Sequence, residues 1–83
     1  RATHVLMTGP VKRSVTIAGH ETSISLEPVF WHALKKFAED RQLPLNAVIA
    51  QIDAQRIELD NPPNLASAIR VWLMESAVAR LDN

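Results

Sequence analysis

Hydrophobic and polar residues alternate over two short stretches near the start of the chain. The first is SVTI at residues 14–17, and the second is TSISL at residues 22–26. Because successive side chains of a strand point to opposite faces, this period of two predicts two short β-strands. In the second strand the apolar side chains share one face, and the hydroxyl groups of Ser23 and Ser25 line the other.

The period changes to that of a helix at Pro28. Proline fits the first turn of a helix, and the preceding Glu27 suits the positive end of the helix dipole. Apolar residues at helical spacing then predict an amphipathic helix of about four turns that ends around Arg41. Pro44 marks a turn, and apolar residues at i, i+3, i+4 and i+7 beyond it predict a second helix.

A third helix is predicted over residues 65–81. Two consecutive prolines break the chain before it, and Asn64 is a suitable N-cap. Its apolar residues cover a broad surface, which suits packing within a dimer, contact between dimers, or a partner protein.

Residues 1–11 show neither period, so we expect a flexible N-terminal arm followed by a single domain over residues 12–83. The chain begins with Arg1, and Met7 is a candidate native start, with residues 1–6 added in cloning. With 83 residues in total, the chain is long enough for one small domain only.

The composition is that of a soluble globular protein, with 47% hydrophobic and 22% charged residues. We find neither a transmembrane pattern nor a signal peptide, and therefore expect a cytoplasmic protein without membrane contact. Because the chain has no cysteine, neither disulfides nor thiolate metal sites support its small core. Its stability must come from packing or from a partner subunit.

The charge balance limits how the protein could bind nucleic acid. Nine basic and nine acidic residues give a net charge of zero. Non-specific coating of nucleic acid depends on many cations that neutralise phosphates, so a neutral chain argues against it. A focused binding site remains compatible with this balance.

Patterns typical of enzymes and metal sites are missing from the sequence. The three histidines, His4, His20 and His32, form no HExxH motif and no pair at helical spacing. The only glycines, Gly9 and Gly19, exclude a glycine-rich phosphate loop, and no serine lies in a GxSxG motif. We therefore expect no catalysis, no metal and no cofactor.

The strand at residues 22–26 cannot be stable alone, because its backbone groups need partners. One alternative is a hairpin with the strand at residues 14–17. The other is pairing with the same strand of a second chain, which would form a two-fold antiparallel ribbon.

From Glu21 to Asp53 the chain resembles the ribbon-helix-helix family, which includes the Arc and methionine repressors. The resemblance lies in the stretches TSISLEP, LKKFAED and LPLNAVIAQI. Over the longer span from KRSVTIAGHETSISLEP to LPLNAVIAQID, with the later NLASAIRVW, the chain is similar to short bacterial ribbon-helix-helix domain proteins. This implies a mainly α fold with a short β-ribbon, in an intertwined homodimer with an additional C-terminal helix.

The resemblance also implies transcription regulation through DNA binding, with the ribbon in the major groove. It places Glu21, Ser23 and Ser25 at the base-facing positions of the strand, and the backbone N–H groups of Leu45 and Asn46 at phosphates. Further candidates for phosphate contacts are Lys12, Arg13 and His20. The residues expected in the dimer core are Ile24, Leu26, Phe30, Leu34, Phe37, Val48, Ile49 and Ile52.

Two departures from the family pattern affect the expected site. Serine is a short and unselective reader of bases, and Glu21 would accept at best from a cytosine amino group. Pro44 stands where family members often place a capping Ser or Thr. The alternatives to DNA binding are a protein-interaction module on the same scaffold and the antitoxin of a toxin–antitoxin pair.

Overall fold

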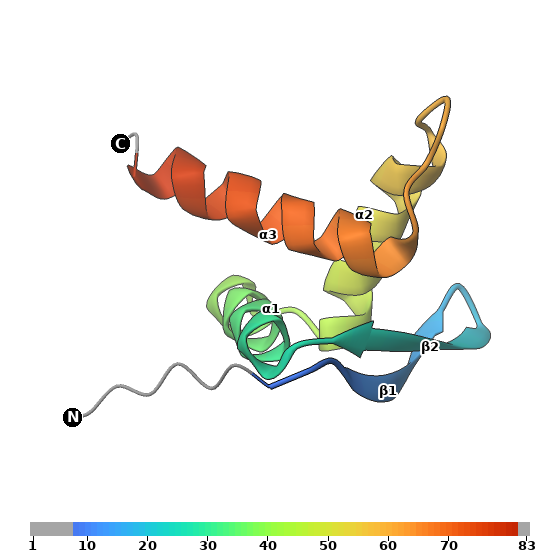
Figure 1. The fold of residues 1–83 in the computed structure, drawn as a ribbon, viewed down its shortest axis with the longest axis horizontal. Coiled ribbons are helices and arrows are strands. Elements are labelled where there is room, and N and C mark those ends of the chain that lie inside the picture. Colours follow the sequence, from blue (N-terminus) through green and yellow to red (C-terminus); the bar gives the residue numbers. More distant parts are fainter. Residues whose placement is uncertain (1–7, 82–83) are drawn as a thin grey trace.

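The computed structural model describes residues 8–81 of the chain. Most of the expected N-terminal arm, including His4 and Met7, lies outside the described residues. All five predicted elements are present (Figure 1): β1 (Val11–Ile17), β2 (His20–Leu26), α1 (Pro28–Arg41), α2 (Leu45–Ile57) and α3 (Leu65–Leu81). The starts of the three helices and the ends of α1 and α3 agree with the sequence predictions, whereas both strands are longer than predicted.

The two strands form an antiparallel hairpin within one chain, which is the first of the two alternatives considered for pairing. Ala18 and Gly19 make the turn, with φ angles of 51° and 81°. Positive φ at both central residues is typical of a type I′ turn, whose twist matches that of the flanking strands. The backbone of β2 therefore has a partner without a second copy of the chain.

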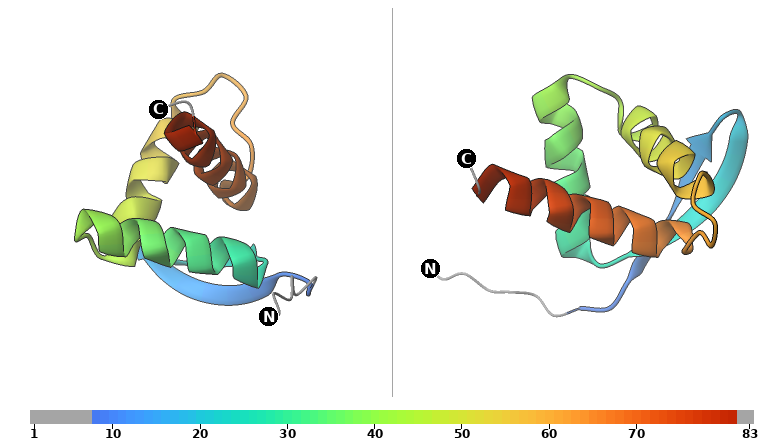
Figure 2. Two further views of the ribbon diagram at one scale, coloured as in Figure 1. Left: turned by 90° about the vertical axis from the view of Figure 1, so that its left-hand side faces the viewer. Right: turned by 90° about the horizontal axis from the view of Figure 1, so that it is seen from above.

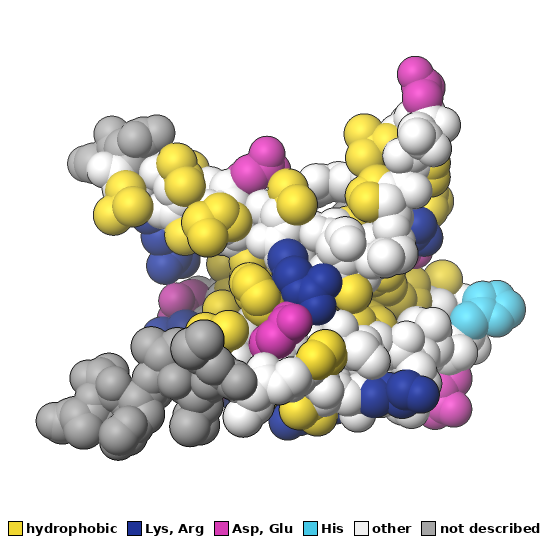
Figure 3. Space-filling view, viewed as in Figure 1, with side chains coloured by type: hydrophobic (Ala, Val, Ile, Leu, Met, Phe, Trp, Pro, Cys, Tyr) yellow, Lys and Arg dark blue, Asp and Glu magenta, His cyan; other side chains and the backbone are white. Residues whose placement is uncertain are grey.

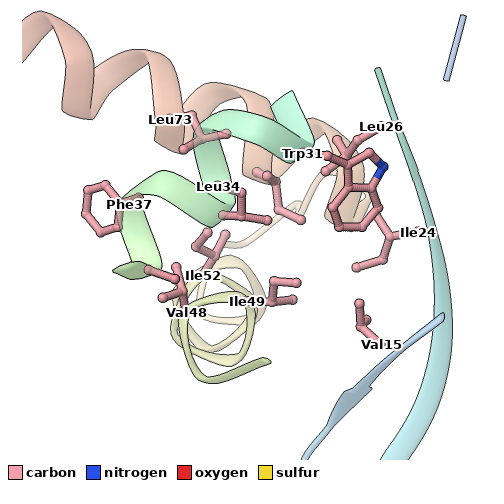
Figure 4. Packing of buried hydrophobic residues seen from close by; sticks show 12 residues of the cluster. Val15, Ile24, Leu26, Trp31, Leu34, Phe37, Val48, Ile49, Ile52 and Leu73 are labelled. Carbon is pink, nitrogen blue, oxygen red and sulfur yellow. The ribbon is translucent and has the colours of Figure 1, made fainter. Parts of the chain in front are cut away.

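The three helices lie on one side of the hairpin, and α3 crosses over α1 and α2 (Figures 1 and 2). Each strand and each helix contributes to a single hydrophobic core, shown in Figure 4. The core consists of Val15, Ile24, Leu26, Trp31, Leu34, Phe37, Ala38, Val48, Ile49, Ile52, Ile69 and Leu73.

One chain buries most of the residues that were expected in a dimer core. Seven of those eight residues are buried, and the eighth, Phe30, is half-buried. Their burial in the structure is provided by the hairpin and helices of their own chain. Helix α3 takes part through Ile69 and Leu73, so one of its faces packs within the chain.

Local signals in the sequence explain where the helices begin and end. The Asn64 side chain accepts a hydrogen bond of 2.8 Å from the backbone N–H of Ser67 and caps α3 as predicted. The C-cap residue of α1 is Gln42, which has a φ of 58° and donates its N–H to the carbonyl groups of Ala38 and Glu39. This left-handed residue satisfies carbonyl groups of the last turn.

A partly buried ion pair joins the start of α1 to α3. Both Nε and Nη2 of Arg70 lie 2.9 Å from Oε1 of Glu27, and the guanidinium carbon lies 5.7 Å from the centre of the Phe30 ring. The hydrogen bond from Arg70 lowers the pKa of the Glu27 carboxyl below its ordinary value of 4.5. The ionised form of Glu27 is therefore stabilised in the folded chain.

The first prediction tests the hairpin turn with the same substitution at two exposed alanines. Ala18→Gly should raise the free energy of unfolding by roughly 0.5 kcal/mol, because glycine adopts positive φ without the penalty that a Cβ brings. Ala54→Gly, within α2, should lower it by about 1 kcal/mol. Urea unfolding followed by tryptophan fluorescence measures both, and destabilisation by Ala18→Gly would contradict the turn.

The second prediction concerns pH. Since the folded pKa of Glu27 is lowered, the pair contributes stability above about pH 5 and loses it as the pH falls through the folded pKa. The difference in unfolding free energy between the wild type and Glu27→Gln should be constant above this range and shrink below it. Urea titrations at a series of pH values measure the difference, and parallel pH profiles would show that the pair contributes nothing.

Candidate nucleic-acid interface

The outer face of the hairpin carries polar side chains from both strands. Residues that face each other across an antiparallel pair lie on the same face. In the observed register three pairs of polar residues face each other: Lys12 and Ser25, Ser14 and Ser23, and Thr16 and Glu21. The alternate positions Val15 and Ile24 are buried against the helices, so these six side chains point away from the core.

Sequence reasoning found only the β2 half of this face. It placed Glu21, Ser23 and Ser25 at base-facing positions, and all three lie on the outer face of the hairpin. It missed Ser14 and Thr16, because it left open whether the two strands pair with each other. The signal that could have found them is Gly19 in a two-residue connection between two alternating stretches.

The structure separates the two cations that the sequence grouped together. Lys12 shares the outer face with the serines, whereas Arg13 is opposite Ile24 and lies on the other face. The Arg13 guanidinium carbon is 5.4 Å from the centre of the Trp31 ring, and the Trp31 indole N–H donates to the Val11 carbonyl over 2.9 Å. This stacking gives Arg13 a role in holding β1 against α1.

The third candidate for a phosphate contact on the hairpin, His20, is exposed at the start of β2. It is opposite Ile17, next to the turn, and therefore on the same side of the sheet as Val15. The structure does not bring His20 together with the row of hydroxyl groups.

The outer face is electrically balanced and rich in hydroxyl groups. Lys12 and Glu21 are its only charged side chains, and the remaining four are serine or threonine. A hydroxyl group both donates and accepts hydrogen bonds, so it can contact phosphate oxygens and base edges alike. Such a face can form hydrogen bonds with a ligand surface that carries many acceptors, but it discriminates weakly among bases.

The start of α2 offers backbone donors to solvent. The N-cap residue is Pro44, no side chain caps this end, and the Pro44 carbonyl accepts from Ala47 and Val48. The N–H groups in the first turn of a helix have no intrahelical acceptor, and they lie at the positive end of its dipole. Asn46 is exposed and Leu45 is half-buried, so α3 of the same chain does not cover this end.

Other kinds of site are not evident in the described part of the chain. Residues 8–81 contain no group of three or more His, Cys, Asp or Glu side chains that could hold a metal ion. None of the three described helices is long and apolar enough to cross a membrane. A groove of about 430 Å³ lies between α1 and α3 and is lined mainly by apolar atoms, with Lys36, Asp40 and Arg80 among its lining residues.

A polar, solvent-facing β-ribbon followed by helices defines a class of small β-ribbon proteins. A family model described as "Ribbon-helix-helix domain" matches residues 10–77, which include the hairpin, α1, α2 and most of α3. The chain therefore belongs to the ribbon-helix-helix family, and the resemblance seen in the sequence is confirmed. Comparisons with curated proteins and with solved structures found no match.

Proposed function

We propose that the protein is a dimeric DNA-binding transcriptional regulator of the bacterial cytoplasm, which inserts its β-ribbon into the major groove. The observation that carries this proposal is the outer face of the hairpin, which presents six polar side chains and no apolar one. Family membership supports it, because the ribbon-helix-helix domain is a fold of DNA-binding regulators. The proposed activity needs neither a cofactor nor catalysis.

The free edge of β2 is the place where a second copy could join. In the described residues the sheet has two strands, so β2 pairs with β1 along one edge only. The unpaired N–H and C=O groups of such an edge are a template for another strand. In the proposed dimer, β2 of a second copy pairs there antiparallel around a two-fold axis, in keeping with the family.

This arrangement assigns different roles to the two strands. Neighbouring strands lie about 4.8 Å apart, so β1 would lie ~7 Å from the two-fold axis and β2 ~2.4 Å from it. The major groove is about 12 Å wide. The two central β2 strands therefore carry Ser23 and Ser25 over the base edges, while the flanking β1 strands carry Lys12 to the phosphates at the groove walls.

The start of α2 supplies a second kind of phosphate contact in this proposal. The backbone N–H groups of Leu45 and Asn46 would donate to a phosphate, and a dimer would contribute one such site from each copy. The phosphate contacts of Lys12 and of α2 do not distinguish one DNA sequence from another, because phosphates are the same at every base pair. Binding should therefore depend strongly on salt, while base discrimination comes from the hydroxyl groups of the ribbon.

The third prediction uses two neighbouring cations on opposite faces of β1. Lys12→Ala should weaken binding to all DNA sequences alike and reduce the salt slope by about 1 for each phosphate that Lys12 neutralises, because phosphate contacts set affinity through counterion release. Arg13→Ala is the matched control, since it removes the same charge from the inner face and should leave the slope unchanged. Fluorescence anisotropy with DNA from upstream of the gene, at several salt concentrations, measures both variants. Equal slopes for Lys12→Ala and the wild type would place Lys12 away from DNA.

The fourth prediction tests the start of α2. Asn46→Asp should lower DNA affinity by about 1 kcal/mol, or roughly fivefold, because it places a negative charge beside the proposed phosphate. Asn64→Asp is the control, because it adds the same charge at the start of α3 and keeps a capping oxygen. Thermal unfolding should show that both variants remain folded. If Asn46→Asp and Asn64→Asp bind DNA equally well, α2 does not contact phosphate.

A further inference from the structure

Helix α3 has two apolar faces, of which the core uses only one. Ile69 and Leu73 are buried on the inner face. On the other side, four large hydrophobic residues remain exposed, and we name them the outer stripe: Val71 at 55%, Met74 at 60%, Val78 at 46% and Leu81 at 84%. Figure 3 shows hydrophobic side chains gathered along α3.

The spacing of the outer stripe is that of a helix-to-helix contact. Its residues follow one another at intervals of three, four and three, which is the spacing of a and d positions in a heptad repeat. At ~100° per residue they fall within an arc of about 80°, on the side of the helix roughly opposite Ile69 and Leu73. Such a narrow seam fits the side of another helix.

Charges beside the outer stripe indicate which helix it fits. With Val71 at position a, Arg70 occupies g and Glu75 occupies e of the same seam. In a parallel pair of helices, a g residue of one chain faces the e residue of the next heptad in the other. Two copies of α3 would then place Arg70 of each chain opposite Glu75 of the other.

The Arg70 side chain can serve this contact without giving up its internal partner. Its Nε and Nη2 atoms donate to Glu27, and a guanidinium has five N–H donors in total. The ion pair with Glu27 also fixes the Arg70 side chain on one flank of the outer stripe. An antiparallel pair would place Arg70 beside the g position of the second copy, which is Ala77, and so leave the charges unmatched.

We propose that the outer stripe binds the outer stripe of a second copy of this chain, as a parallel, two-fold pair of α3 helices. The contact buries Val71, Met74, Val78 and Leu81 against their counterparts and forms two Arg70–Glu75 pairs between the chains. It is separate from the proposed pairing of β2 edges and does not require DNA binding.

The fifth prediction tests this contact by the association of the chains. Met74→Lys should lower the constant for association through α3 at least tenfold in sedimentation equilibrium and leave association through the β2 edges unchanged, because a buried seam cannot accommodate two opposed ammonium groups. Ala79→Lys adds the same charge at an exposed position of α3 outside the stripe and should associate as the wild type does. Circular dichroism checks that both variants keep their helices. An unchanged association constant for Met74→Lys would overturn the proposal.

A cross-linking experiment tests the direction of the pair, since the chain contains no native cysteine. A parallel seam places residue 74 against residue 74 of the second copy, so Met74→Cys should give a disulfide-linked dimer under mild oxidation. Ala79→Cys is the matched control and should cross-link much more slowly. Equal rates for the two variants would overturn the parallel contact.

The same measurements separate this proposal from the proposed function. If the protein binds DNA as a dimer, while Met74→Lys has no effect and the two cysteine variants cross-link equally fast, the proposed β2 contact stands and the proposed α3 contact is wrong. If Met74→Cys cross-links rapidly but the protein does not bind DNA, the proposed α3 contact stands and the proposed regulator function is wrong.

Discussion

The turn at Ala18 and Gly19 is the constraint on which the rest of the structure depends, because it sets the register of the hairpin. Side chains alternate along a strand, so a slip by one residue would exchange the inner and outer faces of β1. In the observed register, Val15 and Ile24 complete the core under the helices. The same register brings Lys12 together with the hydroxyl groups, and it turns Arg13 toward Trp31. The core and the candidate interface are thus two consequences of one turn.

The helices could be predicted from the sequence because their signals are local. Pro28, Pro44 and Asn64 mark helix starts through their effects on the adjacent backbone, and the apolar spacing that follows them is visible within two helical turns. The C-cap of α1 is Gln42 and not the more usual glycine, yet the spacing of apolar residues was enough to locate the end of the helix within a residue or two.

The hairpin was harder to predict because pairing depends on residues that are distant from one another. The polar face of β2 followed from its alternation, but alternation alone does not decide whether the partner strand belongs to the same chain or to a second copy. The stacking of Arg13 on Trp31 could not be read from the sequence, since the two residues lie 18 positions apart along the chain. Likewise, the broad apolar surface of α3 gave no sign of which side the core would use.

One ion pair and the core packing of one residue separate the two apolar faces of α3. Arg70 holds α3 to the start of α1 through Glu27, and Ile69 beside it enters the core, which fixes the rotation of the helix about its axis. With the rotation fixed, the outer stripe has to face away from its own chain. A domain of 83 residues without disulfides has a small core, and association of folded chains stabilises each of them by mass action. Apolar side chains exposed on the outside of α3 are unfavourable in the free chain, and their burial against another chain recovers that free energy. The ion pair that orients α3 inside the chain therefore also decides which surface is available to another chain.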